Sequence, residues 1–167
     1  MAKNIIWMIT VVAAALLQTT WPDYLKIQGV LPDLSLLLVV YFAIVDGEER
    51  AMFTGVIGGM YQDVASNSVL GHHIICLVIT GYAAGRFSTR LITEHPAIKA
   101  GLVFLAGIAH GLLFRMILYV QDPANGLWQG LITVAVPSAF YTAVITPLAF
   151  LLLGMLFGRR DAPQGGL

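Results

Sequence analysis

Six apolar blocks follow one another along the chain, and short polar segments separate them. The blocks comprise residues 4–20, 34–45, 51–65, 69–85, 97–120 and 127–157. A helix that crosses a bilayer needs about 20 predominantly apolar residues, so 167 residues leave room for about six crossings and little else. The pattern therefore predicts an all-α integral membrane protein with one domain, residues 1–160, built as a bundle of six transmembrane helices.

The blocks differ in length, and two of them are shorter than a full crossing. At a rise of 1.5 Å per residue, the second block covers about 18 Å and the third about 22 Å, whereas the hydrocarbon layer is about 30 Å thick. The last block would cover about 45 Å, but Pro137 and Pro147 interrupt it. We therefore predict short second and third helices, and an interfacial turn of helix around Trp128 before a kinked final span over about 131–157.

Basic residues gather in alternate gaps between the blocks. With six crossings, one side of the membrane receives only Lys26, and Arg115 falls inside the fifth block. The other side receives Lys3, Arg50, Arg86, Arg90, Lys99, Arg159 and Arg160. Because cytoplasmic loops carry the excess of Lys and Arg, both termini are predicted to be cytoplasmic, and residues 161–167 to form a disordered cytoplasmic tail.

Composition narrows the possible classes of function. Hydrophobic residues make up 58% of the chain and charged residues 11%, with a mean hydropathy of +0.83, whereas soluble domains carry about 25% charged residues. The net charge is zero, so the protein has no overall positive electrostatic field that would attract nucleic acid. Cys76 is the only cysteine and is expected to be inert packing. No catalytic or cofactor-binding motif occurs, so we predict a protein that is not an enzyme and has no cofactor.

Small residues recur in the third and fifth blocks. Gly55 and Gly59 are four residues apart and share one face of a helix, and the fifth block contains Gly101, Gly107 and Gly111. In lipid, small residues allow helix backbones to approach closely. We expect these faces to pack helices within the chain; the alternative is a groove for the helix of a partner.

Asp63 lies near the outer end of the third block, where an acidic side chain is costly unless it is paired or hydrated. One possibility is an internal ion pair with Arg115, which lies at a similar depth. The other is a helix end at which the side chain is solvated or holds the following turn. Arg115 has three further options, namely Asp33, Asp122, or an unpaired position with its charge extended to the membrane surface.

Asp33 stands in the sequence Pro32-Asp33-Leu34 and immediately precedes the second block. It is well placed to cap the N-terminus of that helix, and the alternative is recognition of a neighbouring protein at the outer rim.

Three histidines occur in or beside the fourth and fifth blocks: His72, His73 and His110. Adjacent histidines on a helix point about 100° apart, and no Cys or carboxylate accompanies them at the spacing of metal ligands. We therefore expect interfacial or hydrogen-bonded histidines and no metal site.

A series of short motifs occurs in the first half of the chain. In order they are Gln18, Trp21-Pro22, Pro32-Asp33-Leu34, Tyr41-Phe42-Ala43, Gly47, Gly55, Gly59, Asp63 and Ser66-Asn67-Ser68-Val69-Leu70-Gly71. Their order and spacing resemble those of the bacterial rod shape-determining protein family MreD. Beyond residue 85 the resemblance rests on the number and length of the apolar blocks.

The resemblance implies a scaffold subunit, without enzymatic activity, of the machinery that inserts peptidoglycan along the side wall of rod-shaped bacteria. Members of the family are taken to bind MreC, a single-span protein of the cytoplasmic membrane with an outer domain. Through MreC they connect MreB filaments to the RodA glycosyltransferase and its transpeptidase. On this interpretation, the candidates for partner binding or helix packing are Pro32, Asp33, Gly55, Gly59, Asp63 and Gly71.

The chain is also similar to the six-span substrate-binding subunits of energy-coupling-factor vitamin transporters. The shared features are small size, short early helices and the absence of large loops. This second similarity implies a binder of a small molecule, and the polar outer ends of the short helices would line its pocket. The two interpretations differ in class, and a common fold does not decide between them.

Overall fold

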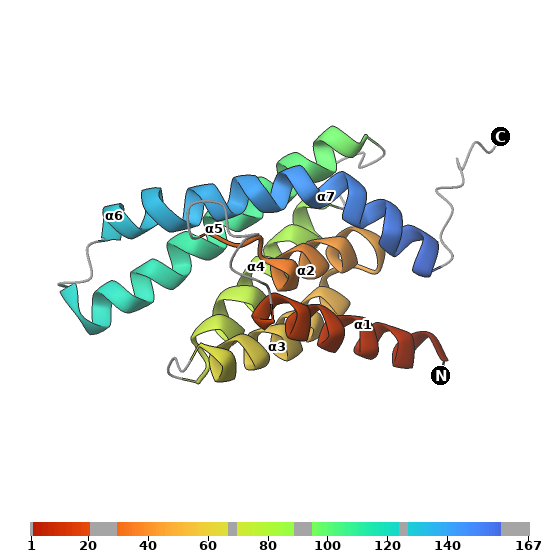
Figure 1. Ribbon diagram of the computed structural model, residues 1–167, viewed down its shortest axis with the longest axis horizontal. Helices are drawn as coiled ribbons and strands as arrows, with labels where there is room; N and C mark the ends of the chain where they lie inside the picture. The colour runs from red at the N-terminus through yellow and green to blue at the C-terminus, as the bar shows by residue number, and fades with distance from the viewer. Residues whose placement is uncertain (1, 21–29, 67–69, 89–94, 124–126, 158–167) are drawn as a thin grey trace.

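The computed structural model describes residues 2–20, 30–66, 70–88, 95–123 and 127–157, and within these residues the secondary structure is entirely helical (Figure 1). The elements are α1 (Ala2–Thr19), α2 (Leu34–Val45), α3 (Glu48–Ala65), α4 (His72–Ser88), α5 (Pro96–Gln121), α6 (Leu127–Gly130), η3 (Leu131–Ala135) and α7 (Val136–Leu156). The prediction of an all-α protein is confirmed.

A helix lies over each of the predicted spans, but the helices differ in their capacity to cross a membrane. Two segments are long and apolar enough to do so: α5, and the continuous 30-residue segment Leu127–Leu156. The apolar part of α1, Asn4–Gln18, and the whole of α2 are shorter. Six crossings therefore stay a prediction.

Successive helices from α1 to α5, and then the last helix, alternate in direction along the chain (Figure 1). At one end of the bundle, which we call the basic end, Arg50 of α3 donates a hydrogen bond of 2.6 Å to Asn4 of α1. At the same end, Arg86 of α4 lies 3.8 Å from Glu48 of α3. The start of α1, the turn between α2 and α3, and the end of α4 thus lie together.

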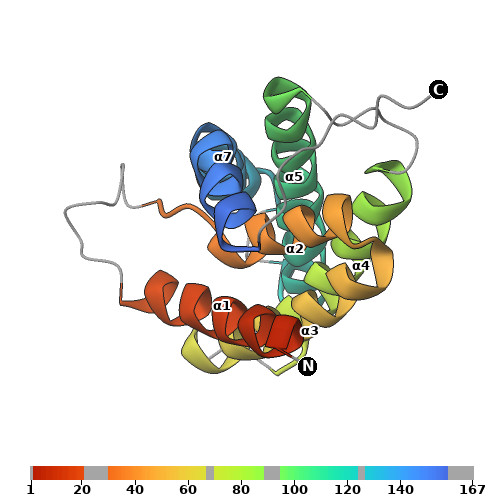
Figure 2. The ribbon, with the colours of Figure 1, turned by 90° about the vertical axis from the view of Figure 1, so that its right-hand side faces the viewer.

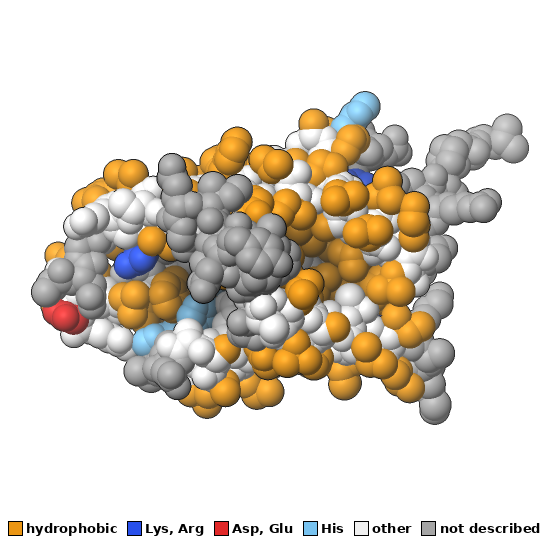
Figure 3. Space-filling model, in the orientation of Figure 1, with side chains coloured by type: hydrophobic (Ala, Val, Ile, Leu, Met, Phe, Trp, Pro, Cys, Tyr) orange, Lys and Arg blue, Asp and Glu red, His pale blue; other side chains and the backbone are white. Residues whose placement is uncertain are grey.

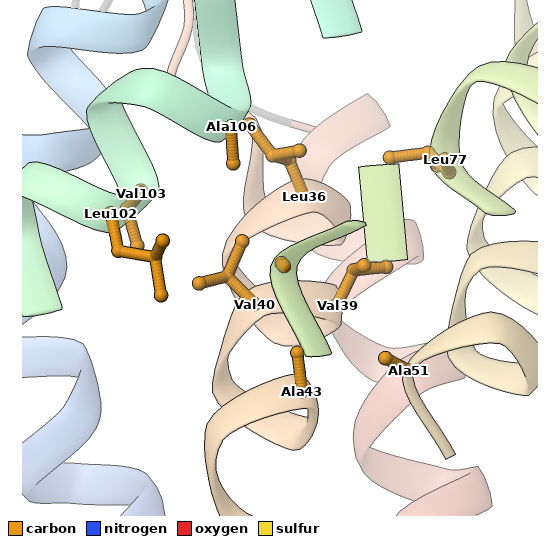
Figure 4. Packing of buried hydrophobic residues seen from close by; sticks show 10 residues of the cluster. Leu36, Val39, Val40, Ala43, Ala51, Leu77, Leu102, Val103 and Ala106 are labelled. Carbon is orange, nitrogen blue, oxygen red and sulfur yellow. The ribbon is translucent and has the colours of Figure 1, made fainter. Parts of the chain in front are cut away.

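α2 forms the centre of the bundle, with the other helices around it (Figure 2). All of its residues from Ser35 to Ala43 are buried. One side packs against α3, α4 and α5 (Figure 4), through Leu36, Val39, Val40, Ala43, Ala51, Leu77, Ala84, Leu102, Val103 and Ala106. The other side packs against α1 and α7, through Leu37, Leu38, Tyr41, Phe42, Val11 and Leu153. A helix that is apolar all round becomes a core element, and α2 follows this rule.

Glycines bring α3 and α4 into direct backbone contact. A Cβ atom on Gly59 of α3 would lie 2.6 Å from Cα of Ile74, and one on Gly85 of α4 would lie 2.6 Å from Cα of Glu48. Real Cβ atoms essentially never approach this closely. The same kind of contact joins α5 to the last helix, where Gly107 faces Ala139. These glycine faces therefore pack helices of this chain against one another.

The last helix contains two prolines and remains continuous over Leu127–Leu156. η3 is a π-helical turn, in which the N–H of Val136 donates to the carbonyl of Leu131, five residues earlier. Pro137 follows directly and has no N–H to donate, so the widened turn falls where the regular bonding pattern is already interrupted. Pro147 lies inside α7 without ending it. The interfacial turn that we expected before the span is the first turn of the same helix.

The contact between α3 and α4 predicts a specific effect of substitution. Gly59→Ala should lower the apparent thermal unfolding temperature in detergent, because the added methyl group meets the backbone of α4 and overpacking costs about 1–3 kcal/mol. Gly101→Ala is the matched control, since no atom lies within 4 Å of a Cβ at that position of α5. Equal unfolding temperatures for the two variants, measured by size-exclusion chromatography after heating, would contradict the close approach.

Candidate functional site

α2 begins inside the bundle, at the end opposite the basic end, and Asp33 caps it. The Asp33 carboxylate Oδ1 accepts a hydrogen bond of 2.9 Å from the backbone N–H of Leu36. Its side chain is only 15% exposed. The first N–H groups of a helix have no partner within the helix, and a carboxylate satisfies them well. The predicted N-cap is confirmed.

Side chains from the surrounding helices converge on Asp33. Gln62 of α3 donates from Nε2 to Oδ1 at 3.0 Å, and Nδ1 of His110 in α5 lies 3.9 Å from Oδ2. The backbone N–H of Asp33 donates to the hydroxyl of Thr142 in α7 at 2.9 Å. On α1, the Gln18 side-chain oxygen accepts hydrogen bonds of 3.2 Å from both the N–H and the hydroxyl of Ser35. Asp33 and its neighbour therefore connect α2 with α1, α3, α5 and α7.

Asp63 holds the turn between α3 and α4. Its carboxylate is fully buried, and Oδ2 accepts a hydrogen bond of 2.7 Å from the N–H of Gly71. Oδ1 lies 2.9 Å from both the backbone N and the ring Nδ1 of His73. Gly71 has a φ of 108°, a conformation that L side chains rarely adopt. Of the roles that we considered for Asp63, the structure therefore shows the one in which the side chain fixes the following turn.

The structure does not bring Asp63 and Arg115 together in the contacts described above. Both oxygens of Asp63 receive donors from the turn and from His73, so the hydrogen-bonding capacity of the carboxylate is used without Arg115. The guanidinium of Arg115 lies against Gly130, where it fills the space that a side chain would occupy. Within the described part of the chain, no ion pair joins Arg115 to a carboxylate.

Two adjoining cavities open beside Asp33. The α5–α7 cavity, of about 180 Å³, lies between α2, α4, α5 and the last helix, and Arg115 is part of its wall. The α1–α3 cavity, of about 280 Å³, lies between α1, α3 and the ends of α2 and α4. The residues that line both are Asp33, His73, His110 and Ser138.

The chemical character of the surface differs at the end of the molecule that contains the cavities, opposite the basic end (Figure 3). Hydrophobic side chains cover most of the described surface on this face, including exposed residues of α1 and α7. Basic, acidic and histidine side chains lie near one another where α5 ends and α6 begins. The polar cavities therefore lie within an otherwise apolar exterior.

Among the described residues, three buried polar atoms have no hydrogen-bond partner: Gln62 Oε1, His72 Nδ1 and His110 Nε2. Gln62 lines the α1–α3 cavity, and His110 lines both cavities. Buried polar atoms are normally satisfied by protein or ordered water, so the unpartnered atoms of Gln62 and His110 are available to hydrogen-bond a molecule in the cavities. In the residues that the structure describes, no group of three or more His, Cys, Asp or Glu side chains is arranged to hold a metal ion.

The other candidate residues lie inside the protein. Gly55, like Gly59, faces the backbone of α4, and Pro32 is buried just before the cap of α2. His72 is hydrogen-bonded through Nε2 to the Gln121 side chain at 2.9 Å. These positions make contacts within the chain and expose little surface to a partner.

The sequence analysis missed the contribution of the last helix to this site. Ser138, Thr142 and Thr146 are spaced four residues apart and therefore share one face of α7. Ser138 donates to the carbonyl of Leu31, and Thr142 receives the N–H of Asp33. The regular spacing of these hydroxyl residues in an apolar block was the signal that would have identified the face.

Taken together, the fold and the site define an all-helical protein with an apolar exterior, a buried polar cluster at one end, and helices long enough to cross a membrane. A family model described as rod shape-determining protein MreD matches residues 1–158. The chain belongs to the MreD family, which consists of membrane proteins that determine cell shape. The search of curated proteins and the search of solved structures found no match. The expected similarity to transporter subunits therefore stays a prediction.

Removal of the Asp63 carboxylate should destabilise the turn before α4. Asp63→Ala leaves the N–H of Gly71 and both groups of His73 without their acceptor, at a cost of about 1–3 kcal/mol for each buried group left unsatisfied. We expect a clear loss of thermal stability in detergent, and a smaller loss for Asp63→Asn, which retains one acceptor oxygen. Glu49→Gln, at an exposed position of α3, is the control for loss of one negative charge. If Asp63→Ala unfolds at the same temperature as Glu49→Gln, the turn does not depend on this carboxylate.

Proposed function

We propose that this protein is a non-enzymatic scaffold subunit of the bacterial cell-elongation complex, in which it binds MreC. Through MreC it connects MreB filaments with the RodA glycosyltransferase and its transpeptidase, and so helps to maintain lateral peptidoglycan synthesis and rod shape. The observation that carries the proposal is the match of the MreD family over residues 1–158.

The surface of the protein supports a role in membrane assembly. Large hydrophobic side chains are exposed along α1 and α7, for example Ile9, which is 62% exposed, and Phe140, which is 63% exposed. Such surfaces suit lipid or the single helix of a membrane partner. The described part of the chain contains no segment of a size that would form a separate catalytic domain.

The residues that we assigned to partner binding act indirectly in this proposal. Asp63 and Pro32 are buried, and Gly55 and Gly59 pack against α4. They determine how α3 and α4 are presented, and a partner contacts the outer surfaces of those helices. A substitution at Asp63 therefore changes MreC binding through the packing of the turn.

We propose further that the protein crosses the cytoplasmic membrane six times, with the basic end and both termini in the cytoplasm. The alternating helix directions and the position of Arg50 and Arg86 at one end support this arrangement.

Cysteine labelling tests the proposed topology. Cys76 is the only cysteine and is fully buried, so Cys76→Ser provides a cysteine-free background. In that background, Asp122→Cys, beyond the end of α5, should react with a membrane-impermeant maleimide in intact spheroplasts. Glu49→Cys, at the basic end, should react only after the membrane is disrupted. Both positions are exposed, so a difference reports sidedness. Labelling of both from the same side would show that the topology is wrong.

Co-purification with MreC tests the scaffold proposal. A tagged wild-type chain extracted in mild detergent should bring down MreC, and depletion of the protein should turn rods into spheres. Complementation by Glu49→Gln should restore both, whereas Asp63→Ala should restore less of each, in proportion to its loss of folded protein. Absence of MreC from the wild-type sample, with cells that stay rod-shaped on depletion, would reject the proposal.

A transporter subunit is the second candidate function, and the two polar cavities are the observation that favours it. Cells depleted of the protein would then keep their shape and require a vitamin for growth.

A further inference from the structure

Arg115 and Asp33 carry opposite charges, face the same cavity, and form no ion pair with each other in the described structure. Arg115 lies against Gly130 at one part of the wall, while Asp33 caps α2 at another. A charge within an apolar bundle is costly unless a counter-charge or water is close to it. The two charged groups therefore give the α5–α7 cavity a negative group at one part of its wall and a positive group at another.

The acceptors near Asp33 indicate what the occupant must donate. Gln62 is 9% exposed, and its Nε2 donates to Asp33, so its unpartnered Oε1 is held in place as an acceptor. His110 Nδ1 lies 3.9 Å from the Asp33 carboxylate, and in the tautomer with its proton on Nδ1 the unpartnered Nε2 is an acceptor. An ammonium group has three N–H donors and suits a site with a carboxylate and two neutral acceptors.

The size and walls of the cavities limit the occupant further. The cavities have volumes of about 180 and 280 Å³, and together they fall in the lower part of the range of about 300–1,000 Å³ typical of sites for drug-sized ligands. The wall of the α5–α7 cavity also contains the apolar side chains of Leu36, Phe114 and Val134. These dimensions suit a short ligand in which a few methylene groups separate two opposite charges.

We propose that the two adjoining cavities bind a small zwitterion, with its ammonium group against Asp33, Gln62 and His110 and its anionic group against Arg115. The chemistry is shared by the headgroup of an aminophospholipid and by a free molecule such as O-phosphoethanolamine. This site is separate from the binding of MreC, so either proposal can fail without the other.

Thermal unfolding in nanodiscs tests the site. The wild-type protein is placed in nanodiscs of phosphatidylglycerol alone, with added phosphatidylethanolamine, or with added phosphatidylcholine, whose quaternary ammonium has no N–H to donate. O-phosphoethanolamine is titrated into the phosphatidylglycerol sample. At a concentration of 100 times its Kd, a ligand that binds only the folded protein lowers the ratio of unfolded to folded protein about 100-fold. We expect phosphatidylethanolamine or O-phosphoethanolamine to stabilise the protein in this way, and phosphatidylcholine to do so much less.

Matched variants connect the stabilisation to the cavity. Arg115→Gln removes the charge that faces the anion and should abolish the stabilisation, whereas Arg86→Gln, at the basic end, should retain it. Asp33→Asn should weaken it while leaving an acceptor for the N–H of Leu36. If Asp33→Asn does not fold, the comparison of Arg115→Gln with Arg86→Gln is sufficient.

Each outcome decides the proposal. Stabilisation by the phospholipid alone identifies a lipid headgroup as the ligand, and stabilisation by O-phosphoethanolamine identifies a free zwitterion. The proposal is overturned if neither probe stabilises the wild-type protein, if phosphatidylcholine is as effective as phosphatidylethanolamine, or if Arg115→Gln is stabilised as much as the wild type.

Discussion

The burial of α2, in which every residue from Ser35 to Ala43 is buried, is the constraint on which the arrangement of the other helices depends. α2 has 12 residues and is about 18 Å long, whereas α5 has 26 residues and is about 39 Å long. Because α2 is apolar on all sides, the other long helices must surround it, and two hydrophobic clusters result. Because it is also short, it begins inside the bundle, where its first N–H groups need partners from the protein. A carboxylate at Asp33 meets that requirement.

Because that carboxylate is buried, it requires polar groups on the neighbouring helices as partners. Gln62, His110 and Thr142 lie on three different helices and all contact Asp33. The longer helices extend past the start of α2, and the space that they enclose beyond it is the pair of cavities. The polar cluster and the cavities are therefore two consequences of one short helix. This arrangement also separates the functions that we propose, since a partner helix would pack on the apolar exterior and a small ligand would lie inside.

The seam between α3 and α4 has a different physical origin. Lipid provides no hydrophobic driving force between helices, so close backbone contact at glycines provides the packing energy. At the end of this seam, Asp63 accepts hydrogen bonds from the turn and from His73 and so joins the two helices where the glycines end. The scaffold role that we propose requires a rigid presentation of helices to a partner, and these two features supply rigidity without a large core.

Much of the fold followed from the sequence alone. The sequence predicted the all-helical class, the bounds of α2, the cap at Asp33 and the membership of the MreD family, because each depends on local composition, on neighbouring residues or on the order of short motifs. The contact partners of Asp63 and Arg115 could not be predicted from the sequence. Each charged side chain could have interacted either with a nearby part of the chain or with a residue on another helix. Contacts over long separations in the chain, such as the N–H of Asp33 with Thr142, arise only when α2 is placed against α7. Tertiary packing alone decided that Arg115 faces a cavity, because the close contact of α5 with the last helix determines where its side chain can lie.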